Sequence, residues 1–309
     1  MDRRLFLRSA ALTGAAGLLA ACTGSAGGDS GGAAVGATPG AQPSSLDDYI
    51  AQIAPDAEPA SLSVSTGSFE QLVGASQPFA FGATTADNES LDGAEVELYV
   101  VPSGRPSTGP YPTTFHELPD NPRGLYLANV DLDAPGPTAF VAVTADGSRA
   151  GLAAVEVRTI ETSQVPAPTR PAVAVATPTL AEPGAVAAIC TREPACTMHE
   201  VSLDAALREG RPIVLEFATP AYCQTTACGP SVDVLDAVRA DRDWGDTAFI
   251  HVEIYSDEGV TLAPAVQEWA LPSEPWLFTI ARDGTIAGRA DGSLLVLSDH
   301  VTALTEQLQ

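Results

Sequence analysis

The stretch Glu95-Val96-Glu97-Leu98-Tyr99-Val100 decides the fold of the first half of the chain. Its valines and leucine occupy every second position and its acidic residues stand between them. This is the period of a β-strand that buries one face and exposes the other. The stretch therefore predicts a half-buried strand within a sheet.

The same alternation recurs on both sides of that strand. Residues 61–64, 78–81, 124–132, 139–144 and 151–157 repeat it, and the last two flank the hairpin signal Asp146-Gly147. Roughly seven short strands in about 100 residues are typical of an immunoglobulin-like sandwich. We therefore predict an all-β immunoglobulin-like sandwich over residues 46–158, which would serve as a spacer or a binding module.

The N-terminus predicts export. Arg3-Arg4 precedes a short apolar run that ends in Leu19-Ala20-Ala21-Cys22. A basic head, a short apolar core and a small-residue exit make a signal peptide, here residues 1–21, and the paired arginines favour the twin-arginine route. The exit resembles a bacterial lipobox, which implies acylation of Cys22 and anchoring in the cell membrane on its extracytoplasmic side. Residues 22–45, rich in Gly, Ala, Ser and Pro, would form a flexible tether.

Composition limits the partners and the chemistry. The net charge of −24 repels phosphate groups, so we exclude nucleic acids as partners. The sequence has no lysine, which excludes Schiff-base chemistry at a lysine. Beyond Cys22 there are four cysteines, and all lie in the C-terminal part: Cys190, Cys196, Cys223 and Cys228. An even number of cysteines in an oxidising compartment indicates disulfides or redox pairs.

The pattern of apolar residues is different in the second half of the sequence. A proline-rich stretch at residues 159–184 predicts a semi-rigid linker between domains. Residues 213–217 then form a continuous apolar run with one acid, typical of a buried strand. Predicted helices at residues 231–239 and 298–308 alternate with further predicted strands. Strands that alternate with helices indicate an α/β sheet over residues 185–309.

This order resembles the thioredoxin superfamily. Three local features carry the resemblance: the run Val214-Leu215-Glu216-Phe217-Ala218-Thr219, the cysteines Cys223 and Cys228 at the junction of strand and helix, and Glu274-Pro275-Trp276, which is similar to the family's cis-proline loop. The resemblance implies that residues 185–309 are an α/β thioredoxin-like domain. The chain departs from the family in its Cys-x4-Cys spacing, because the usual spacing is Cys-x2-Cys.

The resemblance also implies roles for four residues. Cys223 would be the nucleophile near a helix N-terminus, which lowers a thiol pKa, and Cys228 would be the resolving cysteine. Glu216 would shuttle a proton as a buried acid, unless it points to solvent. Pro275 would present backbone groups to an extended substrate, or would only define a turn.

The pair Cys190 and Cys196 is open to three interpretations. We expect a structural disulfide that closes a small loop. The alternatives are a thiol pair that relays electrons to Cys223 and Cys228, and a Cu(I) site formed with Met198 and His199. We expect no bound metal and no cofactor.

These features favour a thiol–disulfide oxidoreductase that acts on the thiols and disulfides of envelope proteins. The alternative is a non-enzymatic binding or scaffold lipoprotein in which the Cys223–Cys228 bond is a structural staple. A peroxidase and a copper-delivery protein are further candidates. The sequence does not place His251 or His300 near Cys223, as copper delivery would require.

Overall fold

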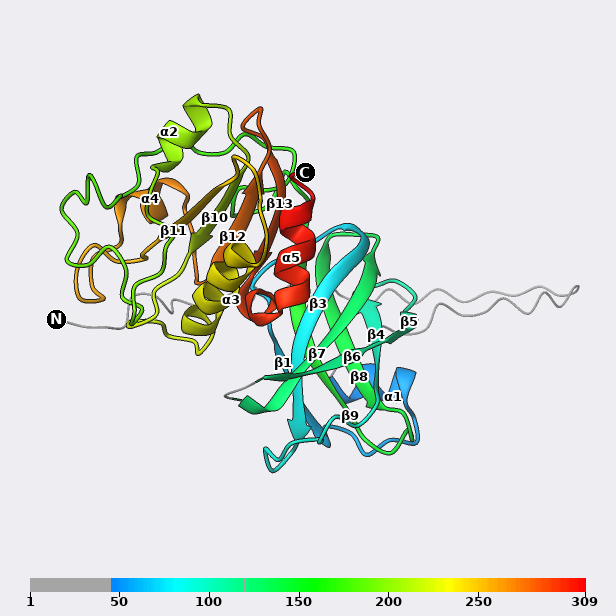
Figure 1. Ribbon diagram of the computed structural model, residues 1–309. Coiled ribbons are helices and arrows are strands. Elements are labelled where there is room, and N and C mark those ends of the chain that lie inside the picture. Colours follow the sequence, from blue (N-terminus) through cyan, green and yellow to red (C-terminus); the bar gives the residue numbers. More distant parts are fainter. Residues whose placement is uncertain (1–45, 119–120) are drawn as a thin grey trace, which may run out of the picture. The chain divides into compact units, whose positions relative to one another are not determined.

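A computed structural model describes residues 46–118 and 121–309 (Figure 1). The predicted signal peptide, the lipidation site at Cys22 and the tether fall outside the described residues. Among the residues described, no helix has both the length and the apolar character needed to cross a membrane.

The described residues of the N-terminal half form one helix and nine strands. These are α1 (Leu46–Ile53), β1 (Leu62–Thr66), β2 (Gln71–Leu72), β3 (Gly74–Thr85), β4 (Val96–Pro102), β5 (Thr108–Pro112), β6 (Thr114–Leu118), β7 (Asn121–Leu132), β8 (Gly136–Thr144) and β9 (Ala150–Arg158). One sheet has the order β1-β3-β7-β6 and the other has the order β2-β9-β8-β4-β5. All of these neighbouring strands pair antiparallel except β2 and β9.

Aromatic rings fill the space between the two sheets. Phe79 of β3 stacks on Phe140 of β8 with ring centroids 3.9 Å apart, and Phe81 stacks on Tyr126 at 5.4 Å. All four side chains are almost fully buried. Because β3 and β8 belong to different sheets, the Phe79–Phe140 contact links the two layers, whereas Phe81 and Tyr126 pack within one sheet. The predicted β-sandwich is confirmed, and Leu98 from the opening stretch lies in its core.

A second, smaller core lies on the outer face of the five-stranded sheet. There Ile50 of α1 packs with Val141 and Val143 of β8. The intervening residues Phe140 and Ala142 point into the sandwich core, so β8 is buried on both faces. This double burial explains why residues 139–143 form an uninterrupted apolar run.

The C-terminal half combines four strands with short helices. In chain order these are α2 (Leu203–Arg208), β10 (Ile213–Phe217), α3 (Cys228–Asp241), β11 (Ala248–Val252), α4 (Pro264–Glu268), β12 (Trp276–Ile280), β13 (Ile286–Asp291), the 3-10 helix η1 (Gly292–Val296) and α5 (Ser298–Glu306). The sheet order is β11-β10-β12-β13. Only β10 and β11 run parallel.

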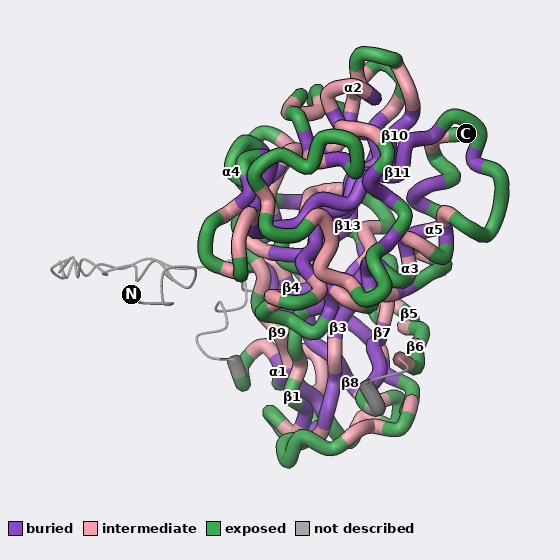
Figure 2. Tube along the Cα trace, turned by 60° about the vertical axis from the view of Figure 1, so that its left-hand side comes forward, coloured by how far each residue is buried: buried purple, intermediate pink, exposed green. Residues whose placement is uncertain are grey.

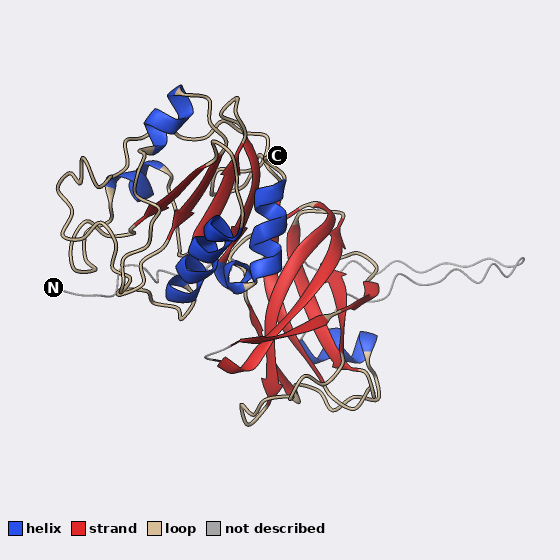
Figure 3. Cartoon of the chain, in the orientation of Figure 1, coloured by secondary structure: helices blue, strands red, loops and turns tan. Residues whose placement is uncertain are grey.

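Alternate residues of β10 point to opposite sides of this sheet. Leu215 and Phe217 pack into a cluster that includes residues of α2 and α4. Val214 and Ala218 pack into the cluster on the other face, which includes residues of α3 and α5 (Figure 3). The buried parts of the chain follow the strands, whereas the exposed parts gather in the connecting loops (Figure 2).

The predicted α/β thioredoxin-like domain requires correction. Strands and loops dominate the described chain, and only one pair of strands in the C-terminal sheet is parallel. The helices α2 and α4 of this half are short, with six and five residues. Helices of so few turns contribute little helical stability of their own.

The proline-rich stretch at residues 159–184 contains no helix or strand. It is nevertheless fixed to the β12–β13 hairpin, because the Thr169 amide donates to the Ile286 carbonyl and the Ala172 amide donates to the Gly284 carbonyl, both at 2.9 Å. These bonds cover the outer edge of the sheet, which would otherwise present unpaired backbone groups.

Candidate functional site

A disulfide joins Cys223 to Cys228 at the point where β10 leads into α3. The Cα atoms are 6.0 Å apart, within the range of a disulfide. Cys223 lies in the loop and is half-buried, whereas Cys228 is the first residue of α3 and is fully buried. One sulfur therefore faces the surface and the other faces the core, and the predicted disulfide between these two residues is confirmed.

The loop geometry permits this bond. Residues five positions apart on one helix lie about 8 Å apart along its axis, too far for a disulfide. The helix begins only at Cys228, so the preceding residues are free to bend back. The Thr225 hydroxyl oxygen accepts a hydrogen bond from the Ala227 amide at 3.3 Å and lies 3.2 Å from the Cys223 sulfur.

Glu216 is fully buried in β10, so its predicted alternative position facing solvent is excluded. Its side chain shares a face of the strand with Val214 and Ala218, whose cluster includes Cys228. Neither carboxyl oxygen has a hydrogen-bond partner, and the nearby Ser231 hydroxyl donates to the Cys228 carbonyl. Burial raises the pKa of Glu216 to about 7, and the charge of His251 opposes this rise.

The residue before Pro275 is the acid closest to the disulfide. The Glu274–Pro275 peptide bond is cis, and the Glu274 carboxylate accepts a hydrogen bond from the Gln224 amide at 3.2 Å. One oxygen of Glu274 and the sulfurs of Cys223 and Cys228 all lie within 4.8 Å of one another. Burial raises the pKa of Glu274. The sequence analysis did not assign Glu274 to the disulfide site. Its position directly before Pro275 was the feature that could have indicated it.

Pro275 itself is buried and its carbonyl is already engaged. The Gly292 amide donates to that oxygen at 3.0 Å. Pro275 therefore contributes by positioning Glu274, and its own carbonyl is not free for the expected contact with an extended substrate.

A second group brings together Cys190, Cys196, His199 and His251, which we call the four-residue cluster. The expected Cys190–Cys196 disulfide is corrected, because both cysteines are free and their sulfurs lie 3.8 Å apart. The Cys196 sulfur lies 3.1 Å from His199 Nε2 and 3.4 Å from His251 Nδ1. The sequence had grouped His199 with the cysteines but had left His251 unplaced.

The thiols of the cluster influence each other. The hydrogen-bond contact between the two sulfurs lowers the pKa of Cys190 and raises the pKa of Cys196. Cys190 therefore gives up its proton more readily than Cys196 does. Met198 contributes its carbonyl oxygen, which accepts a hydrogen bond from the His251 amide at 2.9 Å.

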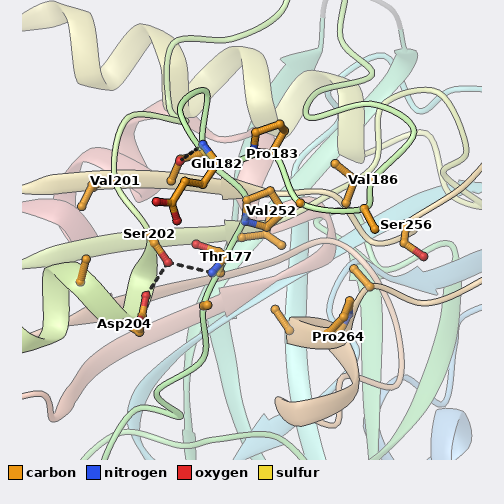
Figure 4. A pocket seen from close by; sticks show the side chains of 18 of the residues that line it. Thr177, Glu182, Pro183, Val186, Val201, Ser202, Asp204, Val252, Ser256 and Pro264 are labelled. Atoms are coloured by element: carbon orange, nitrogen blue, oxygen red, sulfur yellow. Dashed lines mark hydrogen bonds between the residues drawn. The ribbon is translucent and has the colours of Figure 1, made fainter.

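A separate pocket, which Val252 of β11 helps to line, contains no cysteine or histidine (Figure 4). Its polar groups bind one another: the Ser202 hydroxyl accepts from the Thr177 amide at 2.8 Å and donates to Asp204 at 2.5 Å. We therefore locate the candidate chemistry at the disulfide and at the four-residue cluster.

Comparisons with known proteins find structural similarity over only part of the chain. No protein-family model matches it, and neither does any curated protein. Among solved structures, the Lin-41 filamin domain is similar over 32% of this chain and 92% of that chain, with 11% identity and a TM-score of 0.23. The Escherichia coli adhesin FdeC is similar over 32% of each chain, with 16% identity and a TM-score of 0.22. The ZirS C-terminal domain is similar over 41% of this chain and 86% of that chain, with 14% identity and a TM-score of 0.20.

These comparisons also correct the expected family resemblance. The similar structures are immunoglobulin-like and other all-β domains, with no thioredoxin-like protein among them. At such low TM-scores they carry no argument about activity. The resemblance to the thioredoxin superfamily is therefore withdrawn, and any function has to be argued from the sites themselves.

Proposed function

We propose that this chain is an exported thiol–disulfide exchange protein whose working pair is Cys223 and Cys228. One observation carries the proposal: a half-buried sulfur is bonded to a buried sulfur, and a buried carboxyl lies within 4.8 Å of both. Exchange needs one sulfur that another molecule can attack and one that is shielded from it.

The proposed reaction is the reduction of this disulfide by a substrate dithiol. A substrate thiolate attacks the Cys223 sulfur, the Cys223–Cys228 bond breaks, and Cys228 leaves as a thiolate. The second substrate thiolate then attacks the mixed disulfide and releases Cys223. The substrate loses two electrons and two protons and becomes a disulfide, and the pair gains both. The reverse sequence would reduce a substrate disulfide.

Glu274 is proposed to exchange a proton with the leaving thiolate. Because burial raises its pKa, a fraction of the carboxyl is protonated nearer to neutral pH than an ordinary glutamate would be. In the forward direction the acid protonates Cys228, and in the reverse direction the carboxylate accepts that proton. Glu216, on the same side of the sheet as α3, provides a second buried acid with a pKa of about 7.

The signal at residues 1–21 supports export, and we propose that Cys22 carries the lipid anchor. The substrates would then be the thiols and disulfides of other envelope proteins. The immunoglobulin-like sandwich would extend the redox half from the membrane or bind a partner. The net charge of −24 argues against nucleic acids among the partners.

The reduction potential of the pair tests the proposal. The mature chain is equilibrated in glutathione buffers, free thiols are alkylated, and the fraction of bonded Cys223 is measured by peptide mass spectrometry. A working pair should be half-reduced above about −300 mV. A potential below that value, together with no alkylation of Cys223 after mild reduction, would refute exchange and favour a structural staple.

Kinetics of exchange with a dithiol peptide test the role of Glu274. Glu274→Gln should slow exchange and remove the part of its pH dependence that follows the carboxyl. Glu258→Gln is the matched control, because Glu258 is exposed and lies in a neighbouring loop. Equal rates and pH profiles for wild type and both variants would exclude a proton-transfer role for Glu274.

A further inference from the structure

We propose that Cys190, Cys196, His199 and His251 bind one zinc ion with tetrahedral geometry. The inference is independent of the exchange reaction at Cys223 and Cys228. It rests on the spacing of four donor atoms, on the contacts that orient them, and on their burial.

The spacing of the donors matches a zinc tetrahedron. With Zn–S bonds of about 2.3 Å and Zn–N bonds of about 2.0 Å, the edges are about 3.8 Å between two sulfurs and about 3.5 Å between sulfur and nitrogen. The observed Cys190–Cys196 sulfur distance is 3.8 Å. The sulfur-to-nitrogen distances are 3.1, 3.4 and 3.8 Å, and all four donor atoms lie within 4.8 Å of one another.

The same spacing is wrong for a disulfide. A sulfur–sulfur bond is about 2.05 Å long, so the two thiols would have to approach by almost 2 Å. The histidine nitrogens lie close to both sulfurs, an arrangement that a disulfide does not need. Two thiolates and two neutral imidazoles would also balance the charge of a divalent ion.

Contacts around the cluster orient its ligands. The Nε2 atom of His251 lies 3.1 Å from the Ala218 carbonyl oxygen. When Nε2 donates its proton to that oxygen, Nδ1 directs its lone pair toward the sulfurs. Such a second contact is typical of metal-bound histidine. The Cys196 amide also points at the Cys190 sulfur, at 3.4 Å, and would stabilise a thiolate there.

Burial indicates a structural role for the ion. Cys196, His199 and His251 are each less than a tenth exposed, and Cys190 is half-buried. Four protein ligands complete a tetrahedron and leave no position for a substrate, which distinguishes structural from catalytic zinc. Thiolate and imidazole donors also exclude magnesium and calcium, which prefer oxygen.

The ion would fix a part of the chain that has no regular structure. Cys190, Cys196 and His199 lie between the proline-rich stretch and α2, whereas His251 lies near the C-terminal end of β11. Zinc would therefore tie this segment to the sheet. The neighbouring residue Thr191 extends the attachment, because its hydroxyl donates to Glu253 at 2.9 Å and accepts from the Ala221 amide at 3.0 Å.

The test uses the mature chain purified under reducing conditions without chelator. Metal content is measured by mass spectrometry for wild type, Cys196→Ser, His251→Asn and His251→Cys. The control is the double variant Cys223→Ser with Cys228→Ser, which leaves the cluster intact. We expect one zinc per chain in wild type, in the control and in His251→Cys, which supplies another good ligand. Cys196→Ser and His251→Asn should lose most of the metal.

Cobalt provides a second readout that does not depend on any variant. Co²⁺ titrated into the metal-free wild-type chain should saturate at one equivalent and develop the visible absorption of tetrahedral thiolate coordination. Added zinc should remove that absorption. The proposal is overturned by a Cys190–Cys196 disulfide that persists under these reducing conditions, by binding of copper but not zinc, or by octahedral cobalt. Loss of exchange activity in the control, with zinc retained, would leave the zinc site standing.

Discussion

Asp291 should make the folded chain less stable as the pH rises from about 4 to about 7. This residue ends β13 and is 3% exposed. Its two carboxyl oxygens accept hydrogen bonds from the amides of Phe69 at 2.8 Å and Glu70 at 3.3 Å. The charged groups around it are Arg289, which is paired with Glu70, and Arg158, which lies 3.5 Å from Glu70.

The sign follows from the shift of the pKa. Burial raises the pKa of Asp291 from 3.8 to about 7, although the two amides and Arg289 oppose the rise. Between these pH values the folded chain holds a proton that the unfolded chain has lost, so raising the pH favours unfolding. The stability from the protonated carboxyl is complete below about pH 4 and is lost as the pH rises through about 7. The shift corresponds to about 4 kcal/mol, since one pKa unit is worth about 1.4 kcal/mol.

Asp291→Asn removes the titratable carboxyl group and keeps the size and shape of the side chain. The free energy of unfolding is measured in urea at several pH values between 4 and 8, for wild type and for the variant. The variant is expected to be less stable at pH 4, because its amide group faces a backbone N–H and cannot accept from it, at a cost of about 1–3 kcal/mol. Between pH 4 and pH 8, the unfolding free energy of the variant should rise by about 4 kcal/mol relative to that of the wild type. Parallel stability profiles would refute the reasoning.

Three further substitutions, with Val260→Ala as a control, test the packing, the surface and the backbone. Phe140→Ala should lower the unfolding free energy by about 3–5 kcal/mol, because it empties the centre of the sandwich; Val260→Ala, at a residue 77% exposed, should change it little. Arg282→Ala should change the unfolding free energy little although the side chain makes two hydrogen bonds to Asp246, because both residues are exposed. Gly292→Ala should cost more than about 1 kcal/mol, because φ is +56° and a Cβ there would lie 2.2 Å from a backbone oxygen. Urea unfolding checks all of these, and a core variant as stable as the wild type would contradict the packing argument.

The sequence predicted local structure well where one physical pattern decided it. The alternation in residues 95–100 identified β4, and Leu98 indeed lies in the sandwich core. The apolar run before Cys223 identified β10, and the six-residue window from Cys223 to Cys228 identified the disulfide. In each case the determining contacts lie within a few residues of one another, so the sequence itself contains the information.

The sequence could not predict the contacts between distant segments. It suggested a disulfide for Cys190 and Cys196, because two nearby cysteines in an oxidising compartment are most simply paired. The structure instead directs both toward His251, which is more than fifty residues away on β11. From the sequence, Glu274 was likewise only the residue before Pro275, whereas the folded loop brings its carboxyl to the Cys223–Cys228 bond.

The sequence by itself thus determined the strands, the sandwich and the cysteine pair next to α3, because spacing and apolar periodicity act over short distances along the chain. Only the tertiary structure decided which residues surround each sulfur. Parallel pairing of β10 with β11 sets Glu216 opposite His251 and brings the histidine to its cysteines. Such a juxtaposition depends on how the strands associate, and no local pattern of residues specifies that association.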